Sequence, residues 1–81
     1  MTHGEYVVGI NFNPSKDDTV AKIKRAAADL IDLIYDISAT YEQGSVTVVN
    51  GEVNHLKALA MTHAEDAAVW AVKAATKSPK E

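Results

Sequence analysis

The longest hydrophobic pattern in the chain lies between Val53 and Thr76, a segment without proline or glycine. Its apolar positions recur at intervals of three and four residues, which is the repeat of a helix. A helix that is apolar over so much of its circumference needs more than one neighbour. We therefore predict a helix from about Glu52 to Thr76 that packs through one stripe against its own chain and through another against other copies. The first stripe is Val53, Leu56, Ala60, His63, Ala67, Trp70 and Ala74, and the second is Met61, Ala64, Ala68, Val72 and Ala75.

A second helical pattern begins near Ser15 and fades after Thr40. Ser15 and Asp18 have the spacing of a capping box, which predicts the start of this helix. Acidic residues lie opposite its apolar seam, and there we expect a solvated face formed by Asp29, Asp32 and Asp36. The seam itself alternates by three and four residues, as in a coiled coil, and consists of Val20, Ile23, Ala27, Leu30, Ile34, Ile37 and Tyr41.

The segments around these helices carry weaker signals. The run from Tyr6 to Ile10 has the composition of a strand, but a strand without a partner is unstable, so we predict that residues 1–15 form an extended N-terminal arm and a turn. The run from Val46 to Val49 also resembles a strand, yet it is short and lies between breaks at Gly44 and at Asn50. We predict a loop there, with an early helical turn as the alternative, and a charged tail at residues 78–81.

Two helices of about 25 residues, joined by a loop of about ten, form an antiparallel hairpin roughly 37 Å long. The predicted fold class is therefore all-α, an antiparallel two-helix hairpin domain at residues 16–77 with an extended N-terminal arm. One hairpin seam leaves Ile31, Tyr35, Met61 and Val72 without cover. Small chains without disulfides usually solve this by oligomerising, so we expect a homo-oligomer of hairpins.

Composition and charge narrow the possible functions. The chain has 81 residues, no cysteine and a formal net charge of −3. The lack of cysteine argues against disulfides and thiolate metal sites and favours a reducing, cytosolic setting. A negatively charged chain is a poor binder of DNA or RNA polymers, which need a basic face, although a few local charges can still hold a small anionic ligand. No segment resembles a signal peptide or a membrane span, so we expect no membrane partner.

Candidate catalytic chemistry is sparse. His63 and Asp66 are one helical turn apart, and His55 lies two turns before His63, which makes a metal site conceivable. We favour the simpler interpretation, in which His63 is a satisfied polar group on the core stripe and His55 is exposed. The chain has no HExxH motif, no glycine-rich phosphate loop and no nucleophile elbow. We predict that the protein is not an enzyme and uses no cofactor or metal, with a metal-dependent hydrolase as a remote alternative.

Basic residues cluster at the start of the first predicted helix, at Lys16, Lys22, Lys24 and Arg25. One interpretation is ion pairing within the helix, from Lys22 to Asp18 and from Arg25 to Asp29. The other joins the cluster to Phe12, which lies in the turn just before the helix. An aromatic ring and a cation at a helix N-terminus can hold a base by stacking and a phosphate by charge.

Two sequence patterns resemble those of a family of small phage proteins. The first is NFNPS at Asn11 to Ser15, followed by V-x-x-I-K at Val20 to Lys24. The second is A-x-T-x-x-E-x-A-x-x-W-A-V-K-A, which extends from Ala60 to Ala74. The latter is similar to the second helix of the hairpin domain shared by phage anti-CBASS type 2 proteins and the first class of anti-Thoeris proteins. Together the two matches cover both predicted helices.

This resemblance implies a sponge, namely a hexamer of hairpins that binds cyclic oligonucleotide messengers of bacterial immunity without cleaving them. In the members that bind cyclic dinucleotides, an aromatic residue before the first helix stacks on a base and a lysine in this helix meets the phosphates. The matching positions are Phe12 and Lys24, with Asn13 as a further polar contact, while Ala26 stands where those members carry a small hydroxyl residue. We expect these residues to form a site between subunits, with the Lys24 ammonium reaching a neighbouring subunit's turn.

The resemblance thus implies that the protein sequesters a cyclic dinucleotide and evades CBASS immunity in the cytoplasm of a phage-infected bacterial host. Two alternatives stay open at this point. One is a sponge for a cyclic ADP-ribose-type messenger. The other is a non-enzymatic phage interaction protein that binds a host protein through the same hairpin oligomer.

Overall fold

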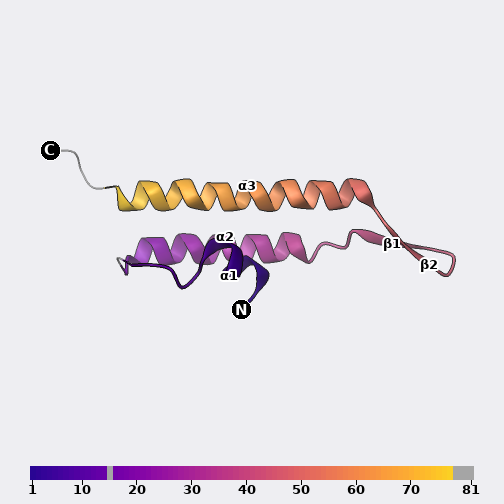
Figure 1. Ribbon diagram of the computed structural model, residues 1–81, viewed down its shortest axis with the longest axis horizontal. Coiled ribbons are helices and arrows are strands. Elements are labelled where there is room, and N and C mark those ends of the chain that lie inside the picture. The colour runs from indigo at the N-terminus through magenta and orange to yellow at the C-terminus, as the bar shows by residue number, and fades with distance from the viewer. Residues whose placement is uncertain (15, 78–81) are drawn as a thin grey trace.

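The computed structural model describes residues 1–14 and 16–77. These residues form α1 (His3–Val8), α2 (Asp18–Tyr35), β1 (Thr40–Gln43), β2 (Val46–Val49) and α3 (Gly51–Thr76), in that order. The long helices α2 and α3 lie side by side and antiparallel, and α1 packs against α2 (Figure 1). The predicted helical hairpin is therefore confirmed, whereas the all-α class is corrected to a mainly helical fold with a small sheet.

Helix α2 begins at Asp18, because the carboxylate of Asp17 accepts hydrogen bonds from the backbone N–H groups of Thr19, at 2.8 Å, and Val20, at 3.3 Å. The cap predicted at Ser15 lies outside the described residues. The helix ends at Tyr35, so the predicted continuation toward Thr40 is wrong.

The end of α2 is fixed by polar contacts that replace the next helical turn. The Lys57 ammonium on α3 donates to the backbone carbonyl of Tyr35 at 2.8 Å and also to that of Ile37. The Tyr35 carbonyl is one of the last in the helix, which have no donor within the helix, and Ile37 lies two residues beyond its end. Lys57 therefore ties the C-terminal end of α2 to α3.

The segment predicted as a loop forms the β1–β2 hairpin instead. The strands pair antiparallel, with Tyr41 opposite Val48, and are joined by a turn that contains Gly44 at a φ of 65°. Thr40 and Tyr41 have high strand propensity, but in the sequence they continue a helical repeat. The sequence therefore did not reveal β1, the strand that pairs with β2. The Asn50 side chain then accepts from the Val53 N–H at 3.1 Å and starts α3, as predicted from Asn50.

The N-terminal arm is helical rather than extended. Thr2 and Glu5 form a reciprocal capping box at the start of α1, and Gly9 ends the helix in the left-handed region at a φ of 62°. A β-carbon added to the buried Gly4 would lie 2.2 Å from the Ala28 carbonyl oxygen of α2. Glycine is therefore what allows the two helix backbones to approach this closely.

Helix α1 also changes the acidic face predicted for α2. The Gly4 N–H donates to the Asp32 carboxylate at 2.7 Å, and the rings of His3 and Tyr35 stack with centroids 4.5 Å apart. Asp32 is only partly exposed as a result, so the prediction of a solvated face is wrong at this position. Asp29 and Asp36 remain exposed.

The assignment of the two stripes of α3 is reversed in the structure. Ala64 and Ala68, from the second stripe, are buried toward α2, whereas Leu56 and Trp70, from the first, are 53% and 60% exposed in the single chain. His63 is exposed as well, so it is not a core histidine. Both stripes are apolar, but the small side chains of the second allow closer helix contact, which the repeat alone does not reveal.

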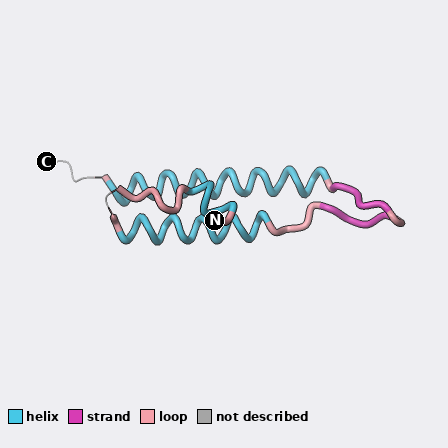
Figure 2. Tube along the Cα trace, turned by 60° about the horizontal axis from the view of Figure 1, so that its bottom comes forward, coloured by secondary structure: helices cyan, strands magenta, loops and turns pink. Residues whose placement is uncertain are grey.

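The core of α2 is shifted in the same way. Its buried positions are Val20, Lys24, Ala28 and Ile31, while Leu30 of the predicted seam is 49% exposed. The shift arises because α2 packs against α1 as well as α3 (Figure 2). Its buried face therefore serves both neighbours. Within residues 1–14 and 16–77, none of the helices combines the length and the apolar character that a membrane span requires.

Candidate functional site

The structure brings together the three residues that the sequence predicted for a ligand site. Phe12, Asn13 and Lys24 line one hollow of about 350 Å³. It lies toward the end of the helical hairpin opposite the β1–β2 hairpin. The loop after α1 supplies the first two residues, the start of α2 supplies Lys24, and the C-terminal part of α3 closes the hollow. Its remaining wall residues are Pro14, Val20, Val72 and Thr76.

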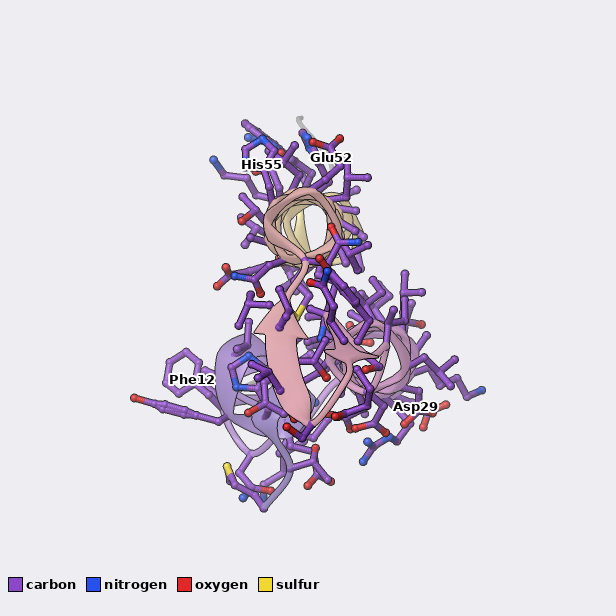
Figure 3. The ribbon with its side chains drawn as sticks, turned by 90° about the vertical axis from the view of Figure 1, so that its right-hand side faces the viewer. Phe12, Asp29, Glu52 and His55 are labelled. Atoms are coloured by element: carbon purple, nitrogen blue, oxygen red, sulfur yellow. The ribbon has the colours of Figure 1, made fainter. Side chains whose placement is uncertain are left out.

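Phe12 is the exposed aromatic part of this hollow. Its side chain is 72% exposed, and it projects to the side of the molecule opposite Asp29 (Figure 3). The Phe12 N–H donates to the Gly9 carbonyl at 2.9 Å, which fixes the turn that carries the ring. The Lys24 ammonium lies 5.4 Å from the ring centroid, within the range of a cation–π contact. The ring is therefore held at its base and open to a stacking partner.

Lys24 is the buried cation of the site, with only 8% of its surface exposed. Its ammonium donates to the Gly9 carbonyl at 3.0 Å and to the Phe12 carbonyl, so it reaches the turn of its own chain rather than a neighbour's turn. An ammonium has three N–H donors, and these two bonds leave one for another acceptor. Lys24 thus fastens the turn that carries Phe12 and still offers a positive charge at the hollow.

Asn13 holds the same loop from its other end. Its side-chain N–H₂ donates to the Asp17 carbonyl at 2.8 Å, and its side-chain oxygen accepts from the Asp17 N–H at 3.2 Å. Both polar groups of the amide are engaged with the residue that caps α2. The contacts of Asn13 therefore position the loop beside Phe12.

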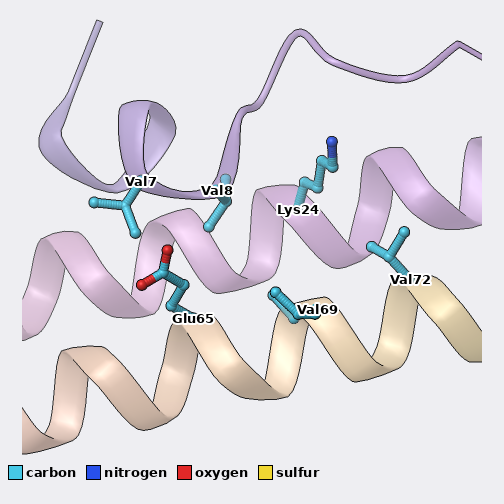
Figure 4. Close-up of a pocket in the computed structure, with 7 residues that line it drawn as sticks. Val7, Val8, Lys24, Glu65, Val69 and Val72 are labelled. Carbon is cyan, nitrogen blue, oxygen red and sulfur yellow. The ribbon is translucent and has the colours of Figure 1, made fainter.

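A second hollow, of about 240 Å³, lies beside the first and shares Lys24 and Val72 with it. Val7 and Val8 of α1 form one wall and Glu65 and Val69 of α3 the other, as Figure 4 shows. Sequence reasoning missed this hollow because it exists only when the N-terminal segment is helical. The capping-box spacing of Thr2 and Glu5 was the signal that could have revealed it.

Two other basic residues near the site, Lys22 and Arg25, form ion pairs. Lys22 pairs with Asp18 at 3.0 Å and Arg25 with Asp29 at 2.8 Å, which confirms the ion pairs proposed for these residues. Arg25 also reaches Glu5 of α1 at 2.7 Å. The hydrogen bond from Arg25, together with that from the Thr2 N–H, lowers the pKa of Glu5 from 4.5 to about 2. The same hydrogen bond to Glu5 raises the pKa of Arg25.

This ion pair makes the docking of α1 sensitive to acid. Because the pKa of Glu5 is lower in the folded chain than in the unfolded one, the stabilisation is present above pH 4.5 and is lost as the pH falls toward about 2. We expect Glu5→Gln to weaken the decline in stability across this window, whereas Glu65→Gln on α3 should retain the wild-type decline. Urea denaturation at several pH values measures the free energy of unfolding. An equal decline of this free energy with falling pH in wild type and Glu5→Gln would contradict the prediction.

The metal site considered from the sequence is not assembled. His55 is exposed, as predicted, and projects from the outer face of α3 (Figure 3). His63 and Asp66 are exposed on the same helix. In the described part of the chain, no three histidine or acidic side chains are grouped closely enough to hold a metal ion.

Comparison with curated proteins and with solved structures finds no significant match. Comparison with protein families finds one described as Acb2/Tad1, hairpin domain, whose profile matches residues 5–76. The matched segment extends from within α1 to the end of α3 and includes Phe12, Asn13 and Lys24. The chain therefore belongs to the family of the Acb2/Tad1 hairpin domain.

Proposed function

We propose that the protein is a phage anti-defence sponge that binds a cyclic dinucleotide messenger of CBASS immunity and sequesters it uncleaved in the cytoplasm of the infected bacterium. The observation that carries this proposal is the pairing of an exposed aromatic ring, Phe12, with a fastened cation, Lys24, in one hollow of an Acb2/Tad1 hairpin domain. In this proposal, Phe12 stacks on a base of the messenger and Lys24 neutralises the charge of its phosphates.

The chemistry of a cyclic dinucleotide suits this hollow. A base has a flat π-face, and stacking on an aromatic side chain contributes about 1–3 kcal/mol per base. The phosphates are anionic, and Lys24 offers them the charge-assisted hydrogen bond that a surface lysine, free to rotate, offers less well. Val20 and Val72 supply apolar wall area for the ligand. Asn13 contributes by keeping the loop in place.

A second copy of the chain is expected to complete the site. The hollow, at about 350 Å³, is near the lower end of the range for small-molecule pockets, roughly 300–1,000 Å³. A shallow groove on α2 and α3, lined by Ile23, Ala27, Leu30, Ala67 and Ala71, offers a surface for another hairpin. Leu56 and Trp70 on α3 extend the apolar area that association would cover. These features support a homo-oligomer, and the family resemblance favours a hexamer.

A cyclic ADP-ribose-type messenger is the alternative ligand, because its adenine and phosphates present the same two chemical groups. A panel of cyclic dinucleotides and cyclic ADP-ribose isomers in a thermal-shift assay distinguishes them. If no cyclic nucleotide raises the melting temperature, the protein would instead be an interaction protein that binds a host partner through the exposed apolar face of α3.

The role of Phe12 gives the most specific test of the binding mode. Phe12→Ala should lower the affinity for the cyclic dinucleotide by about 1–3 kcal/mol, since one base stack is lost. Tyr6→Ala is the matched control, because Tyr6 is a comparably exposed aromatic residue, at 68%, that does not line the hollow. Calorimetric titration measures both variants beside wild type. Unchanged affinity of Phe12→Ala, with an intact fold, would contradict the proposed site.

A further inference from the structure

Helix α1 leads directly into the turn that carries Phe12. The helix is capped by Gly9, whose carbonyl accepts from the Phe12 N–H at 2.9 Å and from the Lys24 ammonium at 3.0 Å. Between Gly9 and Phe12, the Ile10 N–H donates back to the Glu5 carbonyl of α1 at 3.0 Å. The turn is therefore bonded to the end of α1 as well as to Lys24 on α2.

Helix α1 lies along α2 and is attached to it by polar contacts (Figure 1). The Gly4 N–H donates to the Asp32 carboxylate at 2.7 Å, and the Glu5 carboxylate pairs with Arg25 at 2.7 Å. The first N–H groups of a helix have no partner within it, so Asp32 supplies the acceptor that the Gly4 N–H needs. Docking of α1 thus depends on Arg25 and Asp32, two residues of α2 that do not line the hollow with Phe12.

Helix α1 is too short to persist away from α2. It has six residues, and an isolated helix of fewer than about 12 residues is marginal in water. If α1 leaves α2, the helix unfolds and the Glu5 carbonyl no longer holds the Ile10 N–H. The Gly9 carbonyl that Lys24 binds then belongs to a segment that is not anchored at its start, and ordering this segment again costs conformational entropy. The position of the turn therefore depends on α1.

We propose that docking of α1 on α2 positions the turn for the ligand, with Gly4 and Asp32 as positioning residues. Neither of them lines the hollow that contains Phe12 and Lys24, so they act through the turn and not by contact with the ligand. This inference rests on the proposed function, because it concerns the same site. A chain whose binding-competent state is only partly populated binds more weakly by that fraction. The coupling is reciprocal, so a bound ligand stabilises the docked helix.

Gly4→Ala tests the docking without weakening the helix itself, because alanine forms helices better than glycine. A β-carbon at this position collides with the Ala28 carbonyl oxygen and comes within 2.8 Å of the Asp32 carboxylate. Gly51→Ala is the matched control, since Gly51 also begins a helix but a β-carbon there meets nothing within 4 Å. In calorimetric titration, Gly4→Ala should bind the cyclic dinucleotide roughly tenfold more weakly, and Gly51→Ala should bind as wild type does.

Hydrogen exchange measured by NMR tests the positioning without any ligand. In the free protein, Gly4→Ala should speed the exchange of the Ile10 and Phe12 amides roughly tenfold and leave the amides in the middle of α3 unchanged. Adding the cyclic dinucleotide to wild type should slow the exchange of Ile10. If wild type binds no cyclic nucleotide, the proposed function fails, whereas exchange in the free protein still decides whether α1 holds the turn.

Asp32 offers a second test that leaves the backbone of α1 unchanged. Asp32→Asn keeps a side-chain oxygen that can accept from the Gly4 N–H, whereas Asp32→Ala removes it. Asp32→Ala should therefore lose at least roughly threefold more affinity than Asp32→Asn. Circular dichroism checks that each variant stays helical. Wild-type affinity and exchange in Gly4→Ala would overturn the proposal, and so would weaker binding in which Ile10 and Phe12 keep their wild-type exchange.

Discussion

Replacing Ile31 by alanine is expected to lower the free energy of unfolding by about 2–5 kcal/mol, the usual cost of removing a large aliphatic side chain from a core. Ile31 has no exposed surface and is the largest fully buried side chain in the described part of the chain. The total stability of a domain is only about 5–15 kcal/mol, so this loss is a large share of it. Urea denaturation followed by circular dichroism measures the change.

Leu33→Ala is the matched control for this prediction. It removes a side chain of the same size, two positions away on α2, that is 69% exposed in the single chain. The expected loss for such an exposed position is within about 0.5 kcal/mol. A larger loss for Leu33→Ala than for Ile31→Ala would mean that the core of α2 faces a different side from the one described.

The second large effect is expected at Lys24. Lys24→Met keeps an unbranched apolar stem in the buried position but removes the ammonium that donates to the carbonyls of Phe12 and Gly9, and the Gly9 carbonyl then keeps only the Phe12 N–H. Hydrogen bonds to charged groups contribute about 1.5–3 kcal/mol, and we expect a decrease in stability of that size. Binding of the cyclic dinucleotide should weaken as well, because the variant loses the positive charge and loosens the turn that carries Phe12.

Lys22→Met provides the contrast for Lys24→Met. The Lys22 side chain is 77% exposed and pairs with Asp18 at the surface, where an ion pair contributes at most about 1 kcal/mol. Denaturation and calorimetric titration are both needed, because they separate the two roles of Lys24. Wild-type stability of Lys24→Met would contradict its role in fastening the turn, and wild-type affinity would contradict its role in the ligand site.

The sequence predicted that the two long helices exist because their signals are local, but it extended α2 to Thr40 and the helix ends at Tyr35. The apolar repeat and the Asn50 cap placed α3 within one residue of its observed start. The sequence did not determine which apolar stripe faces inward, since periodicity describes a helix and not its neighbours. Leu30 and Trp70 were therefore assigned to the core, and the buried row of Ala28 and Ile31 was missed.

The small elements were missed for a different reason. The capping box of Thr2 and Glu5 and the terminating Gly9 are local signals for α1, but a six-residue helix is stable only when it packs on another element. That packing depends on the contact of Gly4 with α2, which no sequence pattern shows. The β-hairpin was hidden because Tyr41 fits a helical repeat as well as a strand.

The candidate site, like the fold, could be predicted only in part, because some of its contacts join residues that are far apart in the sequence. Phe12 and Lys24 were assigned to a ligand site by resemblance to a family, and the structure places both at one hollow. Their role in binding stays a prediction. The contacts of the Lys24 ammonium with Gly9 and Phe12 join residues 15 and 12 positions apart and depend on the path of the chain after α1. The second hollow beside Val7 and Val8 likewise requires that α1 be folded.

A sponge binds the cyclic dinucleotide and releases it chemically unchanged. The most direct measurement is to incubate the protein with the ligand for several hours, remove free ligand by desalting, denature the protein and analyse the released ligand by chromatography. We expect the ligand to elute with the native protein and to be recovered as the unchanged cyclic compound. A ligand that elutes apart from the protein would contradict binding, and a linear product released from the protein would contradict sequestration without cleavage.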